Sequence, residues 1–332
     1  PWTIRNELES LAEYSSYRDS YGLAFAHDQG VDNCFAPRGK SVYEMPGLTG
    51  CFSFMSYEEI LNWTISACIY SNLAGDWNWA KAKRKVLCSC LESLIARDAN
   101  GDGIIDIDSD RCKGGAEITT YDSLDISLGQ ARNNLYLAVK AWSAFVCLDA
   151  LLRKIDGRET EESQIAAKAA NLAASTIAAN MLEPDGFIPA IFQSDNRSRI
   201  IPAIEGLIYP GFCGAPEAVA IDGPYRELVC ALKRHLENVL VPGLCIDSYS
   251  GGWKLSSTSK NTWLSKIFLN QYIAEHILGI CDERLSRDAI HASWLKTGSA
   301  DFAATDQVDS ANGKDLGSRL YPRLVTSILW LG

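Results

Sequence analysis

The segment that most constrains the fold is residues 129–154, because it is apolar on nearly every side. Leu135, Val139, Trp142, Phe145 and Leu148 lie along it, and most positions between them are also apolar. A helix without a polar face must be covered all round, which is typical of an inner helix in a large assembly. The sequence therefore predicts a helix here that other helices surround.

Helical patterns also occur at residues 56–73, 77–97, 159–181, 225–240, 262–278 and 284–296. In residues 77–97 the apolar side chains recur with the 3.6-residue period of a helix. Ser56 with Glu59 three residues later predicts a capping box at the start of the first of these helices.

The connections between these helices alternate between short and long. The long ones are residues 19–55, 98–128, 183–224 and 242–261, and loops of this length in a compact domain are usually functional. This pattern indicates an all-α chain with an α/α toroid, in which long loops on one face build a pocket. We find no repeat or linker that divides it, so we expect one domain over residues 1–332.

Charge and cysteine usage exclude several classes of partner. The chain has 31 Lys and Arg against 41 Asp and Glu, a net charge of −10, which disfavours nucleic acid. No uninterrupted apolar run approaches the roughly 20 residues that cross a bilayer, and we see no signal peptide, so we expect no membrane partner. The 11 cysteines are scattered, without Cys-x-x-Cys pairs. This predicts reduced thiols in a cytoplasmic protein, with Cys68, Cys90, Cys147 and Cys230 at apolar positions.

Residues 98–109 match the spacing of an EF-hand calcium loop. Asp98, Asn100, Asp102 and Asp106 occupy its first, third, fifth and ninth positions, with glycine at the sixth. Ser109 stands at the twelfth position, where a bidentate acid belongs, and acids flank it on both sides. Two interpretations stay open, a structural Ca²⁺ site and an Asp/Gly turn between two helices.

Acidic side chains gather in residues 114–125, just before the predicted inner helix. Glu117, Asp122 and Asp125 lie there among hydroxyl groups and Tyr121. Paired carboxyl groups suit glycosyl transfer, in which one donates a proton while the other attacks or activates water. A helix N-cap is the competing interpretation for Asp125 or the nearby Ser127.

Three further positions are candidates for contacts with a sugar. His27 and Asp28 stand together in a glycine-containing loop, and Glu205 is a lone acid in an apolar run. Trp253 and Lys254 lie in a Gly/Ser-rich loop, where a ring can stack on a sugar and an ammonium can bind hydroxyls. The competing interpretations are a turn for His27-Asp28 and packing or a solvated loop for the others.

Several long motifs resemble the β-xylosidases of glycoside hydrolase family 52. They are GGAEITTYDSLDISLGQARNNLYLA at residues 114–138, IPAIEGL at 201–207, GGWKLSSTS at 251–259, WLSK at 263–266, YPR at 321–323 and VTSILW at 325–330. The Thr-Tyr-Asp pattern and a His-Asp-x-Gly loop also occur in the related glucosidases of family 116.

This resemblance implies a retaining exo-β-1,4-xylosidase that acts on xylo-oligosaccharides or aryl β-xylosides. It implies Asp122 as the general acid/base and Thr120, His27 and Asp28 as sugar-contacting groups. Trp253 and Lys254 are carried over in the same way. No cofactor is required for this chemistry, and a structural Ca²⁺ is the one ion that we consider.

The resemblance also implies an N-terminal β-sandwich followed by an (α/α)6 catalytic toroid, which residues 1–332 would form. It further implies a nucleophilic Glu upstream of Pro1. We therefore expect this chain to be the toroid portion, with an N-terminal segment of the same enzyme as its partner. Glu205 or Glu117 could serve instead if either faces Asp122 at about 5–5.5 Å. A β-glucosidase-like toroid hydrolase and a non-catalytic carbohydrate-binding fragment stay open as alternatives, and a homodimer is a further assembly to consider.

Overall fold

The protein is mostly helical, as expected. A computed structural model describes residues 1–27, 30–31, 34–40, 42–45, 54–112, 117–193, 195–280, 287–297, 306–317 and 322–331. The α-helices in this part of the chain are α1 (Trp2–Ser10), α2 (Ser56–Ala74), α3 (Trp77–Ala96), α4 (Leu135–Asp156), α5 (Glu161–Ala179), α6 (Tyr209–Phe212), α7 (Arg226–Val239), α8 (Leu264–His276) and α10 (Asp288–Trp294). Shorter helical turns are η1 (Leu11–Ser15), η2 (Val42–Glu44), η3 (Asp110–Cys112), η4 (Ile126–Gly129), η5 (Pro202–Ile208), η6 (Pro216–Val219) and η8 (Pro322–Leu331).

Helix α4 is the inner helix that the sequence predicts. Every residue from Leu135 to Leu148 is buried, and α2, α3, α5, α6 and η5 all pack against it. By length and composition α4 could cross a membrane, but 89% of its most apolar window is buried inside the protein. Its hydrophobicity is therefore explained by its place in the core.

Helices α2 and α3 form one helical hairpin and α4 and α5 form another, and the turns of both are specified locally. Gly75 and Gly157 end α2 and α4 in the left-handed conformation, which glycine adopts without a steric penalty. Asp76 and Thr160 then cap α3 and α5 by accepting hydrogen bonds from the Trp79 and Ser163 backbone N–H groups. Short turns of this kind hold α2 against α3 and α4 against α5.

Short strands occur near both ends of the described chain. Strands β1 (Ser16–Asp19) and β2 (Gly22–Phe25) form an antiparallel hairpin, as do β3 (Gly30–Val31) and β4 (Cys34–Phe35). Strands β5 (Asn261–Trp263), β6 (Gln307–Asp309) and β7 (Asp315–Gly317) form an antiparallel sheet.

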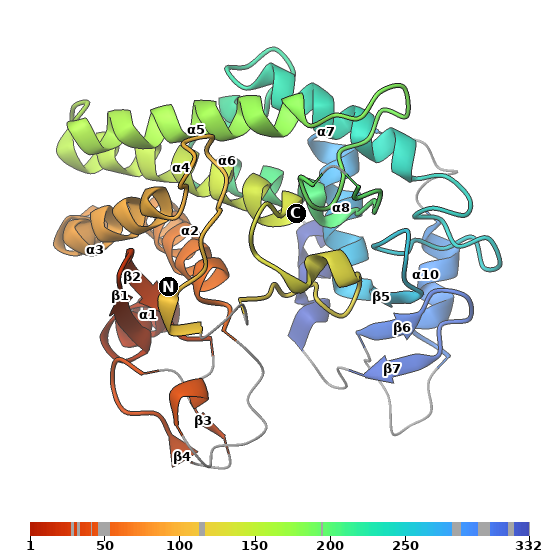
Figure 1. Ribbon diagram of the computed structural model, residues 1–332, viewed down its shortest axis with the longest axis horizontal. Helices are drawn as coiled ribbons and strands as arrows, with labels where there is room; N and C mark the ends of the chain where they lie inside the picture. The colour runs from red at the N-terminus through yellow and green to blue at the C-terminus, as the bar shows by residue number, and fades with distance from the viewer. Residues whose placement is uncertain are drawn as a thin grey trace.

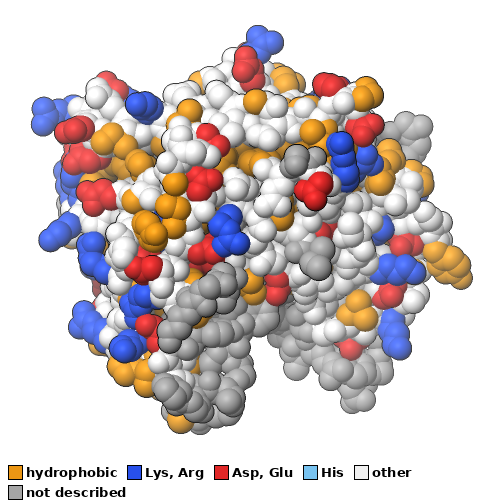
Figure 2. Space-filling model, in the orientation of Figure 1, with side chains coloured by type: hydrophobic (Ala, Val, Ile, Leu, Met, Phe, Trp, Pro, Cys, Tyr) orange, Lys and Arg blue, Asp and Glu red, His pale blue; other side chains and the backbone are white. Residues whose placement is uncertain are grey.

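The N-terminal hairpins and the C-terminal sheet lie on opposite sides of the molecule (Figure 1). The segment around residues 117–134, yellow in Figure 1, crosses between them. In the same orientation, Figure 2 shows acidic and basic side chains interspersed over the described part of this face. The acidic segment singled out from the sequence thus lies where the two sides meet.

The predicted boundaries need two corrections. Ser56 is not the N-cap of α2: Met55 is, without a side-chain cap, and the N–H of Tyr57 donates to the distant Glu117 instead (2.8 Å). The inner helix begins at Leu135 rather than at residue 129, because Asn134 caps it by accepting from the Leu137 N–H.

The described cysteines are all free thiols. Cys68, Cys90 and Cys147 are buried as predicted, but Cys230 is exposed on α7 and does not fill the core. The prediction placed Cys230 on the apolar face of this amphipathic helix, whereas its side chain lies on the exposed face. Cys51 and Cys281 lie outside the described residues.

Candidate active site

The tripeptide Thr120-Tyr121-Asp122 lies in a tight turn before η4. The Asp122 N–H donates to the Thr119 carbonyl (3.2 Å), and the Leu124 N–H donates to that of Tyr121 (3.0 Å). Tyr121 is fully buried, whereas Asp122 is only partly buried. The turn therefore inserts one side chain into the core and keeps the next near the surface.

The carboxylate of Glu58, a residue of α2, is buried next to the turn, and Glu58 is 1% exposed. The Thr120 backbone N–H and hydroxyl both donate to it at 2.8 Å. Tyr136 (2.6 Å) and Lys140 (3.1 Å) of α4 donate to it as well. Burial alone would raise the pKa of Glu58, but the Lys140 charge and these hydrogen bonds hold the pKa below its usual value. The Glu58 carboxylate is therefore ionised, and both of its oxygens accept hydrogen bonds.

Glu205 on η5 supplies a second buried carboxylate, which binds Tyr121, the next residue of the turn. The Tyr121 hydroxyl donates to it (2.6 Å), and the Lys266 ammonium from α8 also donates to it. Gly206 lets η5 approach α4 closely, because a Cβ at this position would stand 2.6 Å from the Val139 carbonyl oxygen. Glu205 is 1% exposed, so its carboxylate faces the turn rather than open solvent.

Asp122 has very different surroundings. Its buried Oδ1 has no hydrogen-bond partner among the described residues. Burial raises the pKa of Asp122, the Ser123 N–H opposes this, and the charge of Glu58 raises the pKa further. A carboxyl group whose pKa is raised in this way releases its proton at higher pH than an ordinary aspartate, which is the direction that a general acid requires.

Thr120 and His27, two predicted sugar contacts, interact with consecutive residues of α2, Glu58 and Glu59 respectively. Thr120 is in the turn, and its hydroxyl donates to Glu58. His27 is exposed and lies just after β2. It interacts electrostatically with Glu59: burial raises the pKa of Glu59, and the attraction of His27 opposes part of this rise. Asp28 lies outside the described residues.

Trp253 and Lys254 lie in the segment that follows α7. Trp253 is 1% exposed. Its backbone N–H donates to the His291 ring (3.0 Å), and its own ring meets that of His291 edge-on. Lys254 donates to the Ser257 carbonyl (3.2 Å). An open ring face is needed for sugar stacking, so this geometry favours the packing interpretation for Trp253.

The two remaining acids of the segment have structural partners. Asp125 accepts from the hydroxyls of Ser198, Ser256 (2.5 Å) and Thr258 (2.7 Å), and it caps η4. Glu117 accepts from the Tyr57 N–H and from the Cys112 thiol. The capping interpretation of Asp125 thus describes its place in the fold.

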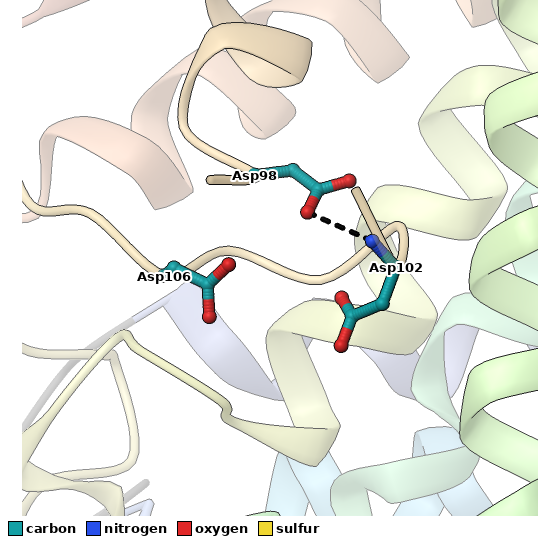
Figure 3. A group of neighbouring side chains, drawn as sticks. All are labelled: Asp98, Asp102 and Asp106. Atoms are coloured by element: carbon teal, nitrogen blue, oxygen red, sulfur yellow. Dashed lines mark hydrogen bonds between the residues drawn. The ribbon is translucent and has the colours of Figure 1, made fainter. Parts of the chain in front are cut away.

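Residues 98–106 form a turn in which three carboxylates converge. Oxygens of Asp98, Asp102 and Asp106 lie within 4.8 Å of one another and point toward a common space (Figure 3). Asp98 accepts from the Gly101 (2.8 Å) and Gly103 (2.7 Å) N–H groups. Burial raises the pKa of Asp102, and the charges of its two acidic neighbours add to this. The remaining predicted ligand, Asn100, accepts from the Asp102 N–H (2.9 Å).

The acids that flank the twelfth position of this loop are engaged elsewhere. Asp108 pairs with Arg132, and Asp110 accepts from Ser20. Ser109 is buried, and its hydroxyl lies against Asp19. A Ca²⁺ ion in this loop would therefore be held by the first nine positions.

Sequence reasoning missed Glu58, Tyr136, Lys140 and Lys266, which hold the turn. One signal was available: Lys140 is the single charged residue between Leu135 and Leu148, and a charge in so apolar a stretch requires a buried partner. That this partner is Glu58, on another helix, could not be deduced from spacing.

Comparison with known proteins places these residues in context. The family model described as Glycosyl hydrolase family 52 matches residues 1–70. A protein named Beta-xylosidase from Geobacillus stearothermophilus is 45% identical over 349 aligned positions, which cover 100% of this chain and 49% of that protein. Over the length that it spans, the chain belongs to glycosyl hydrolase family 52.

A second Beta-xylosidase from Geobacillus stearothermophilus is 31% identical over 217 aligned positions, which cover 61% of this chain and 34% of that protein. The family 52 chain thus spans half or less of the length of these curated relatives. Among solved structures, the unsaturated glucuronyl hydrolase of Bacillus sp. GL1 covers 92% of this chain with a TM-score of 0.45 and 12% identity, and the match covers 67% of that structure.

Proposed function

We propose that the protein containing this chain is a retaining exo-β-1,4-xylosidase in which Asp122 is the general acid/base. The observation that carries this proposal is the contrast at the turn, where Glu58 and Glu205 are fully hydrogen-bonded while Asp122 keeps an unpartnered oxygen. The printed names of both relatives support xylosides as substrates.

In this proposal Asp122 first protonates the glycosidic oxygen of a xylo-oligosaccharide, and the sugar is transferred to a carboxylate nucleophile. Asp122 then removes a proton from the water that hydrolyses this intermediate. A raised pKa supports the first step because the acid must be protonated before the bond breaks. Thr120, His27 and Asp28 are the proposed contacts to the sugar.

The nucleophile is proposed to come from outside these 332 residues. Glu58 and Glu205 are buried with their oxygens occupied, and Glu117 caps α2, so none of the three presents a free carboxylate. The greater length of the relatives leaves room for such a segment. We further propose that the helices described here complete an (α/α)6 toroid, in a cytoplasmic enzyme, and we retain the homodimer and the Ca²⁺ loop as predictions.

A panel of substrates tests this function. The full-length protein is assayed with aryl β-xylosides and the matching aryl β-glucosides, and NMR follows the anomeric configuration of the first product. We expect xyloside hydrolysis with β-xylose formed first. A preference for glucosides would favour a β-glucosidase, while sugar binding without turnover would favour a carbohydrate-binding protein.

A further inference from the structure

Two buried Glu–Lys pairs hold the two residues that precede Asp122. Glu58 of α2 is paired with Lys140 of α4, and Glu205 of η5 is paired with Lys266 of α8. Both glutamates are 1% exposed. A buried ion pair adds little net stability compared with apolar packing, since desolvation offsets the attraction. Two such pairs around one turn therefore suggest a purpose beyond stability.

The two pairs hold the turn in different ways. Glu58 accepts from both the backbone N–H and the hydroxyl of Thr120, so it fixes the main chain two residues before Asp122. Glu205 reaches only the tip of the Tyr121 side chain. A carboxylate bonded to the backbone N–H restricts the direction of the following residues more strongly than a contact at the end of a long ring.

We propose that Glu58 is a positioning residue for Asp122, which fixes the turn through Thr120 and thereby keeps the Asp122 Oδ1 atom without a hydrogen-bond donor among the described residues. This inference rests on the proposed role of Asp122 as the acid/base. Lys140 and Tyr136 complete the arrangement by occupying the other lone pairs of Glu58, which keeps Glu58 itself ionised and fixed.

The charges around the turn support a distinct part for Glu58. It is the ionisable group whose charge raises the pKa of Asp122. Glu205 has no such effect on Asp122, although its burial and its lysine partner are similar. The titratable groups packed around the turn are Glu58 and Glu59 of α2, Tyr136 and Lys140 of α4, Glu205 of η5, Tyr209 of α6 and Lys266 of α8.

The test is an NMR titration of the ¹³C-labelled Asp122 carboxyl group, assigned by comparison with Asp122→Asn. We expect Glu58→Gln to lower the pKa of Asp122 by about half a unit or more, because a negative charge is removed and the turn loosens. Glu58→Asp retains the charge and should keep the pKa raised. Glu205→Gln is the matched control and should leave the Asp122 pKa unchanged.

Glu58→Gln leaves Lys140 without its carboxylate, so the double variant Glu58→Gln/Lys140→Met provides the same test if the single variant does not fold. An unchanged Asp122 pKa in the folded Glu58 variants, or an equal drop in Glu205→Gln, would overturn the proposal. The titration needs no substrate. A protein that shows these shifts but hydrolyses no glycoside would therefore refute the proposed function while leaving the positioning role of Glu58 intact.

Discussion

Asp122 and Asp125 lie in the same turn, and their carboxyl groups have opposite surroundings. Three hydroxyl groups and the Ser127 N–H donate to Asp125. Asp122 has a buried oxygen with no partner among the described residues. A carboxylate that is fully hydrogen-bonded favours the folded state, whereas one that is buried without donors opposes it. Asp125 therefore supports the fold, whereas the surroundings of Asp122 fit its proposed role as the acid/base.

Substitution with asparagine should change stability in opposite directions at these two positions. Asp122→Asn should raise Tm at neutral pH, because it removes a poorly solvated charge. Asp125→Asn should lower stability by about 1–3 kcal/mol, since the hydroxyls of Ser198, Ser256 and Thr258 lose an ionised acceptor. Thermal unfolding of both variants checks this, and a lower Tm for Asp122→Asn would contradict the account.

The pH dependence of these effects follows from the pKa directions. Burial raises the pKa of Asp125, but its hydrogen bonds from three hydroxyls and the Ser127 N–H hold the folded pKa below the unfolded value of about 3.9. Its stabilising contribution is therefore present above that pH and is lost as pH falls through the folded pKa. The folded pKa of Asp122 is raised, so the advantage of Asp122→Asn should be absent well below the unfolded pKa, grow as pH rises above that value, and be complete above the folded pKa. Denaturant titrations across this range should show both trends, and an Asp122→Asn advantage that is equally large in acid would oppose this assignment.

At the level of elements, the loop of residues 98–109 is fixed on α5. Gly103 has a positive φ of 87°, and a Cβ there would stand 2.5 Å from the Ala173 backbone nitrogen. The Thr176 hydroxyl also donates to the Asp102 carbonyl (2.6 Å). The loop and the helix thus support each other whether or not an ion is bound.

Gly103→Ala should destabilise the protein more than Gly101→Ala. Both glycines have positive φ, so both variants bear a backbone cost of about 1 kcal/mol. Space around Gly101 is open, with nothing within 4 Å of an added Cβ, whereas alanine at position 103 must also push α5 away. We expect about 2 kcal/mol or more for Gly103→Ala in denaturant unfolding. Equal losses in both variants would show that the contact with α5 contributes little.

Calcium binding is a separate prediction for the same loop. If Ca²⁺ binds here, adding it should raise Tm and EDTA should reverse the rise, because a ligand that binds only the folded state stabilises it. Asp102→Asn should abolish this response, while Asp110→Asn, which changes an acid outside the loop, should retain it. A Tm that does not respond to millimolar Ca²⁺ would leave the Asp/Gly turn as the correct interpretation.

Local patterns predicted the elements well, and distant pairings account for what they missed. The hairpins around Gly75 and Gly157 follow from caps that lie within a few residues of each helix end. The capping box predicted for α2 was wrong because the Tyr57 N–H at the start of this helix donates to Glu117, which is 60 residues away. Glu58 was missed for the same reason, since its bond to Thr120 spans 62 residues. Asp122 itself was identified through its motif, and its role stays a prediction.

At the scale of the whole molecule, the candidate site lies between the N-terminal hairpins and the C-terminal sheet. The turn with Asp122 is attached to α2 through Glu58, to η5 through Glu205, and to the segment after α7 through Asp125. Segments from the first, middle and last thirds of the chain therefore hold one turn. Such convergence suits a site in which small displacements of a proton donor reduce the rate.

The dependence of Asp122→Asn on the leaving group tests the central claim most directly. In the full-length enzyme, kcat/KM for a natural xylo-oligosaccharide should fall by about 10²–10⁴-fold, because its leaving oxygen needs a proton. An activated aryl β-xyloside needs no such assistance and should lose far less in bond cleavage. Asp125→Asn, as the control, should affect both substrates alike. Equal losses for both substrates in Asp122→Asn would contradict the assignment of Asp122 as the general acid.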